Sequence, residues 1–294
     1  MSNLFPHPDL APLPQHEVRL GELTVRRLLP VRGRRMIGPW CFLDRFGPLT
    51  FADQKPMDVA PHPHIGLQTL TWLFSGEVLH NDSLGNECMI RPEQISLMTS
   101  GRGIAHTEET PSANSGLLDG VQFWIALPEA HRRTEPSYLC TSNLHRSEFP
   151  GAISTAFAPP TATYSAMSGA EYRVHPRSSV DVPLERAHEH GLVLIQGDCR
   201  VEGEALVPNT LYYLAPGPAS VSLASRDGAR LLILGGAPFP EKILMWWNFV
   251  ARDESEIHAA RQAWEREELF GPVPSYRGAR LAAPPLSGRL LPKP

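Results

Sequence analysis

Residues 61–76, PHPHIGLQTLTWLFSG, decide the fold, because two histidines separated by one residue lead directly into a strand-like run. Residues i and i+2 of a strand lie on the same face, so His62 and His64 can point two imidazoles into one cavity. The following LQTLTWLF is apolar, β-branched and aromatic, and Gly76 marks a turn after it. The stretch predicts a buried β-strand that begins beside two possible metal ligands.

A second pair of candidate ligands occurs in GIAHTEE, where His106 and Glu108 are again separated by one residue. Between the two pairs, the short apolar segments ECMIR and ISLM alternate with turn-like residues. Short strands joined by short turns are typical of an antiparallel meander or barrel, in which the two pairs can lie on neighbouring strands. We therefore predict one metal site built from His62, His64, His106 and Glu108.

The residue types of this site indicate its chemistry. Three neutral imidazoles and one carboxylate suit Fe(II), Mn(II), Co(II), Ni(II) or Cu(II), and the lack of thiolates argues against a structural zinc site. Four protein ligands leave open positions for water, dioxygen or a chelating substrate. Glu108 is preferred to Glu109 as the ligand because it shares a strand face with His106. Its carboxylate could also act as a catalytic base.

These motifs, HPHIGLQTLTWLFSGE and RPEQISLMTSGRGIAHTEE, resemble those of the pirin family of the cupin superfamily. Other segments similar to pirin sequences lie on both sides of these motifs, along nearly the whole chain and in the same order as in pirins. They are VRRLLP, GPWCFLDRFGP, DGVQFWIALP, EPSYL and GGAPFPEKILMWWNFVARDESEI. One departure is Gln68, where the first cupin motif usually has Glu; since pirins take their carboxylate from the second motif, we expect the site to survive and its surroundings to change.

The resemblance implies an all-β fold of two cupin-type β-barrels, a bicupin, with a C-terminal helix. It also implies one divalent metal in the N-terminal barrel, with Fe(II) expected and Mn, Co, Ni or Cu as alternatives. The matching ligands are His62, His64, His106 and Glu108.

Two classes of function follow from the resemblance. The first is a bacterial pirin-like oxidoreductase similar to quercetin 2,3-dioxygenase, which acts on flavonols such as quercetin with dioxygen, with Glu108 removing the hydroxyl proton. The second is a metal- and redox-sensing binding protein that regulates a transcription factor or a metabolic enzyme. The ligand set and pocket are shared by both uses, and we favour the enzyme.

The domain organisation follows from the spacing of apolar segments. We expect a metal-binding barrel over residues 1–135, a polar linker over 136–160, and a second barrel over 161–294. The last part is expected to hold a helix at about 254–270 and an extended tail. Asp253 or Ser255 can cap this helix, and three apolar side chains share one face: Ile257, Ala260 and Trp264.

A second HxH pair, His188 and His190, precedes an apolar strand in the second barrel. The downstream segment VPNTLYYLAPG offers no histidine or carboxylate as a further ligand. Two imidazoles alone make a poor closed site, so we expect no metal there.

Several other residues have a structural and a functional interpretation. Trp72, Phe123 and Trp124 are expected mainly in the core, with some bounding an apolar pocket. Arg102 is either a guard at the rim or a solvated turn residue. We expect His80 to be a turn histidine bonded to nearby backbone, with a role for His80 and Asp82 around the site as the alternative.

Composition and charge limit the remaining possibilities. The net charge of −4 gives no reason to expect direct nucleic-acid binding, although a protein partner on DNA is compatible with it. No apolar run reaches the length of a membrane span, and the N-terminal residues lack the features of a secretory signal, so we expect a cytoplasmic protein without membrane contact. The cysteines have no CxxC spacing and are expected to be reduced core residues: Cys41, Cys88, Cys140 and Cys199.

Overall fold

A computed structural model describes residues 10–20, 23–52 and 54–286, and it confirms the all-β expectation. The described residues form 24 strands and one helix. The chain divides into two compact units, each with one large and one small antiparallel sheet. We call them the first barrel, within Glu17–Arg26, Phe42–Ser142 and Pro240–Pro294, and the second barrel, within Met1–His16, Arg27–Cys41 and Asn143–Phe239.

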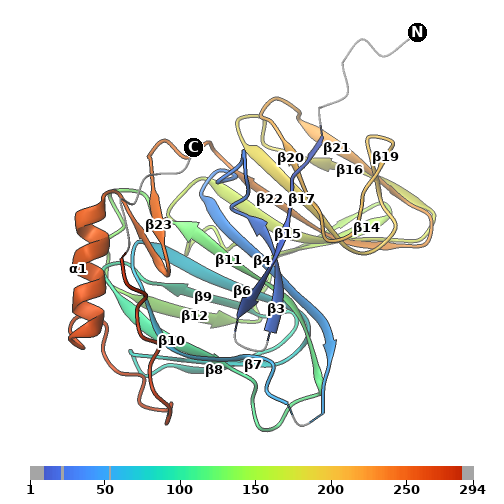
Figure 1. Ribbon diagram of the computed structural model, residues 1–294. Helices are drawn as coiled ribbons and strands as arrows, with labels where there is room; N and C mark the ends of the chain where they lie inside the picture. The colour runs from blue at the N-terminus through green and yellow to red at the C-terminus, as the bar shows by residue number, and fades with distance from the viewer. Residues whose placement is uncertain (1–9, 21–22, 53, 287–294) are drawn as a thin grey trace. The chain divides into compact units, whose positions relative to one another are not determined.

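Two sheets form the first barrel, and Figure 1 shows β6, β9 and β11 in one layer with β10, β7 and β8 in the other. The strands of the larger sheet, in spatial order, are β12 (Ser137–Thr141), β9 (Ile95–Thr99), β6 (Leu67–Gly76), β11 (Leu117–Ala126), β4 (Trp40–Thr50), β3 (Leu23–Leu29) and β2 (His16–Leu20). Those of the smaller sheet are β5 (Asp58–His64), β10 (Ile104–Glu109), β7 (Val78–Asp82) and β8 (Glu87–Ile90).

An apolar cluster fills part of the interior of this barrel. Its buried cluster draws on strands of both sheets and consists of Leu23, Val25, Phe46, Met57, Leu73, Val78, Ile90 and Leu118. In β6 every residue except Ser75 is buried, which explains why LQTLTWLF is nearly continuous in apolar and β-branched residues.

The C-terminal segment also belongs to the first barrel. It forms the hairpin β23 (Leu244–Trp246) and β24 (Phe249–Ala251), followed by α1 (Glu254–Glu265). Asp253 caps the helix by accepting from the backbone N–H of Glu256, as expected. The predicted apolar face of α1 is buried in a cluster that also contains Phe249 and Phe270.

The helix is shorter than the predicted 254–270. It ends at Glu265, and Glu267 and Leu269 then adopt positive φ angles of 58° and 70°, which no helix continues. The chain turns there and places Phe270 against Phe249. The described part of the tail contacts this barrel, since the backbone N–H of Leu281 donates to the carbonyl of Pro61 on β5 at 2.9 Å.

The second barrel has the same two-sheet plan. Its larger sheet has the order β1 (Ala11–Pro12), β20 (Leu211–Leu214), β17 (Glu189–Gly197), β22 (Ala229–Gly236), β15 (Met167–Val174), β14 (Ala152–Ala156) and β13 (Arg146–Phe149). Its smaller sheet has the order β16 (Ser178–Pro183), β21 (Ser220–Ser225), β18 (Arg200–Val201) and β19 (Glu204–Ala205). Leucine and valine side chains of both sheets fill its core, among them Val182, Leu192, Leu223 and Leu231.

The contiguous division predicted from the sequence is wrong in two respects. Residues 136–160 are not a linker, because they form β12 in the first barrel and β13 and β14 in the second. β12 and β13 lie at sheet edges, where exposed side chains keep the sequence polar. Residues 240–286 pack with the first barrel rather than with 161–239, because their apolar helix face is buried against it.

The expectation for the cysteines also needs correction. Cys88 on β8 and Cys140 on β12 form a disulfide, with their Cα atoms 6.8 Å apart. These are the edge strands of the two sheets of the first barrel, so the bond ties one sheet to the other. Cys41 and Cys199 are buried and take no part in a disulfide, as predicted.

Within the described ranges, the structure has no helix long and apolar enough to span a membrane.

Candidate metal centre

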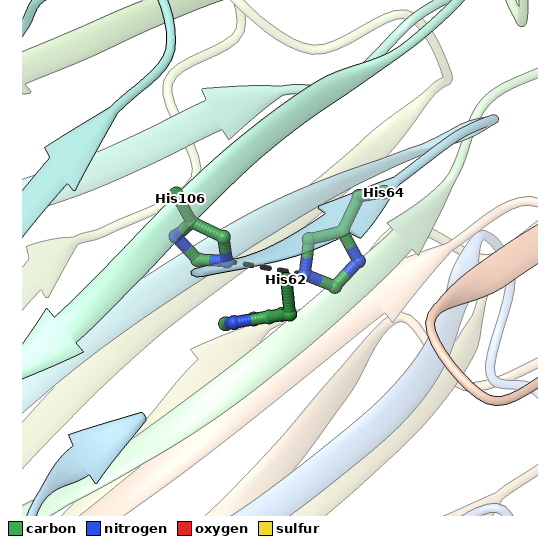
Figure 2. A group of neighbouring side chains, drawn as sticks. All are labelled: His62, His64 and His106. Atoms are coloured by element: carbon green, nitrogen blue, oxygen red, sulfur yellow. Dashed lines mark hydrogen bonds between the residues drawn. The ribbon is translucent and has the colours of Figure 1, made fainter. Parts of the chain in front are cut away.

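Three predicted ligands meet inside the first barrel. The candidate ligand atoms of His62, His64 and His106 all lie within 4.8 Å of one another, and all three residues are buried. The Nε2 atoms of His64 and His106 are 3.1 Å apart. Figure 2 shows the three rings converging from two strands, β5 and β10.

Strand pairing explains this convergence. In the antiparallel pair of β5 and β10, His62 lies directly opposite His106, and directly opposed side chains are close neighbours. His64 follows two residues later on the same face of β5. Pro61 and Pro63 alternate with the histidines and cannot donate to a ladder, which is tolerated because β5 is an edge strand of its sheet.

Two imidazoles are oriented by backbone carbonyl groups. The Nδ1 atom of His62 donates to the carbonyl of Ala60 at 3.0 Å, and Nδ1 of His64 donates to the carbonyl of Asn248 at 2.9 Å. A carbonyl oxygen can only accept, so both Nδ1 atoms carry a proton. In the neutral rings, the Nε2 atoms are bare and available to a metal.

Burial also keeps these rings neutral. It lowers the pKa of His62 to about 4, with a smaller opposing effect from the Ala60 carbonyl. Burial lowers the pKa of His64 and of His106 well below the usual value, with a further contribution from the neighbouring imidazoles. Neutral imidazole is the form that binds metal ions, so the site is ready to bind at neutral pH.

Glu108 lies inside the same barrel but outside the group of three histidines. Gln122 on β11 and Thr71 on β6 face its carboxylate across the barrel, and the Thr71 hydroxyl donates to Oε1 of Gln122 at 2.9 Å. Burial raises the pKa of Glu108 to about 7, against the opposing effect of these two side chains. The carboxylate therefore faces the interior near the site, and its role as a fourth ligand stays a prediction.

Glu109 points elsewhere, as the strand alternation predicts. Its Oε1 atom accepts from Asn81 at 3.2 Å and from the hydroxyl of Thr107 at 2.8 Å. Thr107 and Glu109 thus share one face of β10, and His106 and Glu108 are buried on the other.

His80 and Asp82 lie beside the site, which was only the alternative expectation from the sequence. His80 is not in a turn but on β7, and it is 2% exposed. Its Nδ1 atom lies 3.4 Å from Nδ1 of His106, and its Nε2 atom lies 3.4 Å from Oδ2 of Asp82. Tyr138 stacks on the imidazole of His80 with ring centroids 4.1 Å apart. These residues surround the side of His106 that faces away from the other two histidines.

The remaining candidates separate into core and surface residues. Trp124 lies edge-on to the ring of His64, with centroids 5.2 Å apart, and so forms an apolar wall of the site. Trp72 and Phe123 are core residues. Arg102 is an exposed residue paired with Glu135, which supports the structural interpretation.

Gln68 is fully buried and donates to the hydroxyl of Thr99 on the neighbouring strand β9 at 2.8 Å.

In the second barrel, the two histidine rings lie with centroids 6.2 Å apart. Burial lowers the pKa of His190 to about 4, with a further effect from His188. Across the described ranges, the only group of at least three possible metal ligands is the one in the first barrel. The prediction of a metal-free second barrel is left to experiment.

The donor set of the first barrel fits a divalent transition metal. The Nε2 atoms of His62 and His64 are left as acceptors because their Nδ1 atoms donate to carbonyl groups, and the third imidazole, of His106, lies 3.1 Å from Nε2 of His64. Nitrogen donors of this kind suit iron, nickel, copper, cobalt or zinc alike. The geometry supports a metal site without selecting the metal.

Comparison with known proteins places this geometry in a family. The family model for pirin matches residues 22–125, and the model for the pirin C-terminal cupin domain matches residues 169–270. A protein of Pseudomonas aeruginosa named "Putative quercetin 2,3-dioxygenase PA1205" is 44% identical over 278 residues, which cover 92% of this chain and 88% of that protein. A pirin-like protein of Caulobacter vibrioides is 34% identical over 262 residues, or 84% of this chain and 89% of its relative.

A solved structure agrees over nearly the whole length. The crystal structure of quercetin 2,3-dioxygenase from Acinetobacter baumannii superimposes with a TM-score of 0.90 at 37% identity, and covers 96% of this chain and 97% of that chain. The predicted fold of two cupin domains with a C-terminal helix is thereby confirmed.

Proposed function

This chain belongs to the pirin family, and we propose that it is a metal-dependent dioxygenase that acts on flavonols such as quercetin. The observation that carries the proposal is the convergence of His62, His64 and His106 inside the first barrel. Relatives that bear the name quercetin 2,3-dioxygenase, similar along most of the chain, supply the substrate class. Dioxygen is the second substrate.

The proposed ligands are the three histidines and Glu108, and the proposed metal is Fe(II), with Mn, Co, Ni or Cu as alternatives. When bound, the metal would supply the redox chemistry and polarise the oxygen atoms of the substrate. The protein contributes the donor nitrogens and a buried setting. Water is scarce there, because each of the three histidines is at most 6% exposed.

Glu108 is proposed to remove the hydroxyl proton of the flavonol. A base works best when its pKa lies near the operating pH, and burial raises the pKa of Glu108 to about 7 in the metal-free site. The carboxylate would act as the base once the substrate has displaced it from the metal, and Gln122 and Thr71 face it there from the larger sheet. Trp124, beside His64, offers an aromatic wall to a planar substrate.

Aerobic turnover tests this proposal. The protein would be loaded separately with Fe(II), Mn, Co, Ni or Cu, and loss of quercetin absorbance and uptake of dioxygen would be measured per bound ion. We expect turnover with at least one metal and none without metal. Failure with all five metals would contradict the proposed enzyme. The better hypothesis would then be a metal- and redox-sensing binding protein that acts through a protein partner. A cytoplasmic location stays a prediction of the sequence.

A further inference from the structure

We propose that Asp82 and His80 fix the tautomer of His106, so that its Nε2 atom is held bare toward the metal site. The inference deepens the metal site proposed above and rests on it. It makes His80 and Asp82 positioning residues, which act through His106 rather than on the substrate.

Of the three histidines, only His106 lacks, among the described residues, a backbone carbonyl partner that would set its tautomer. His62 and His64 have a fixed tautomer because backbone carbonyls accept from their Nδ1 atoms. The Nδ1 atom of His106 instead faces Nδ1 of His80 at 3.4 Å. An imidazole nitrogen can donate or accept, so this contact alone leaves the tautomer of His106 open.

Asp82 closes that choice. Its carboxylate can only accept, and it faces Nε2 of His80 at 3.4 Å, so Nε2 of a neutral His80 carries the proton. Nδ1 of His80 is then bare and can accept from Nδ1–H of His106. With its proton held on Nδ1, His106 keeps Nε2 free for a metal ion, which takes the place of the hydrogen bond that Nε2 of His64 would otherwise accept.

The opposite arrangement would block the site. If Nδ1 of His80 donated to His106, His106 would carry its proton on Nε2, directed at the bare Nε2 of His64 only 3.1 Å away. A metal could then not bind His106 without a change of tautomer. The order of donors from Asp82 to His106 therefore decides whether the third ligand is available.

Both members of the pair are held firmly. Oδ1 of Asp82 accepts from the backbone N–H groups of Leu84 and Asn86 at 2.9 and 3.0 Å, and Asn86 Nδ2 donates to Oδ2 at 2.9 Å. Tyr138 stacks on His80 with an interplanar angle of 2°. Strand pairing sets the positions, because Asp82 lies opposite His106 and His80 lies opposite Glu108.

Nitrogen-15 NMR on the full-length protein loaded with Zn(II), a diamagnetic ion that imidazole nitrogens bind, tests the tautomer without any need for activity. We expect His106 to carry its proton on Nδ1 and to face the ion with an unprotonated Nε2. A wild-type His106 that carries its proton on Nε2 in the loaded protein would overturn the inference.

An Asp82→Asn variant tests the cause. Oδ1 of the new side chain can still accept from Leu84 and Asn86, so its amide NH₂ would face Nε2 of His80 and donate to it. The tautomers of His80 and His106 should then both reverse. Affinity for Co(II), measured by competition with a chelator, should fall about 10- to 100-fold, the usual cost of losing such a partner.

A matched control is Asp198→Asn, since Asp198 also accepts backbone N–H groups in a turn, from Arg226 and Asp227. This variant should bind Co(II) like the parent. His80→Phe keeps a ring against Tyr138 but offers His106 no acceptor, and it should also weaken binding. Unchanged affinity in both Asp82→Asn and His80→Phe would overturn the inference.

These outcomes are separable from the proposed function. A parent protein that turns over no flavonol but shows the expected tautomer and Co(II) affinities would refute the enzyme and support the inference. If the parent turns over quercetin and the Asp82→Asn variant binds Co(II) as tightly as the parent does, the enzyme would be supported and the inference refuted.

Discussion

The Nε2 atoms of His64 and His106 lie 3.1 Å apart, although the two residues are separated by 42 positions in the sequence. Nε2 of His64 is a bare acceptor because its Nδ1 donates to the carbonyl of Asn248. Such an atom, buried and directed at a second imidazole nitrogen, is stabilised by a hydrogen-bond donor or by a cation. The proposed chemistry of the protein depends on this relationship.

The Glu108→Gln variant tests whether the Glu108 carboxylate acts as a catalytic base. The change keeps the shape and an oxygen donor and removes the negative charge, so we expect flavonol turnover per bound metal to fall about 10²–10⁴-fold. Glu109→Gln, on the other face of β10, is the matched control and should have little effect. Both variants require a metal determination alongside the rate. Parent-like turnover in a metal-loaded Glu108→Gln protein would exclude the catalytic role.

The same residue should give the metal-free protein a distinct pH dependence. The pKa of Glu108 is raised from 4.5 to about 7 by burial, so its stabilising effect is complete below pH 4.5 and is lost as the pH rises through 7. Relative to Glu108→Gln, the wild-type protein should therefore lose about 3 kcal/mol of unfolding free energy between pH 4.5 and 8. Urea denaturation of both proteins with a chelator present measures this difference. Parallel profiles would show that Glu108 ionises normally.

Comparison with the Gln variant is needed because the histidines have the opposite effect. Burial lowers the pKa of His62, so folding is destabilised as the pH falls from 6.5 towards 4. This contribution is common to both proteins and cancels in the difference.

The second barrel should be dispensable for metal binding. His188→Gln/His190→Gln should leave metal content and turnover within about twofold of the parent, because both residues belong to the second barrel and neither is in the group of three converging imidazoles. Elemental analysis and the flavonol assay measure the two quantities. A loss of metal as large as that in a first-barrel variant would show that a second site exists.

The disulfide between Cys88 and Cys140 predicts a thiol count. Denatured protein without reductant should show two thiols per chain, from Cys41 and Cys199. Replacing both Cys88 and Cys140 by Ser should lower the free energy of unfolding by about 2–4 kcal/mol, because the bond closes a long loop. Reductant should destabilise the parent and leave the double variant unchanged. Four thiols in the untreated parent would contradict the bond.

Strand alternation made part of the site predictable. The period of two places His62 with His64 and separates His106 from Glu109, and the structure follows both expectations. The pairing of β5 with β10 then brings the histidines together. These are local patterns joined by short turns, which a sequence displays directly.

Longer-range features were not predictable in the same way. The partner of His64 is the backbone carbonyl of Asn248, and a carbonyl group leaves no mark on the sequence. Residues 240–286 return to the first barrel through contacts between apolar faces, and spacing along the chain does not indicate which barrel they join. His80 lies in LHNDS, whose polar residues are typical of a turn, yet strand pairing and the Tyr138 ring bury it.

The most direct test of the account is the metal content of purified protein, with and without the β5 ligands. We predict about one transition-metal ion per chain in the parent, since a single group of three convergent imidazoles occurs in the described residues. A His62→Ala/His64→Ala variant, shown by circular dichroism to be folded, should retain almost none. Undiminished metal in this double variant would contradict the assignment of the metal centre to the first barrel.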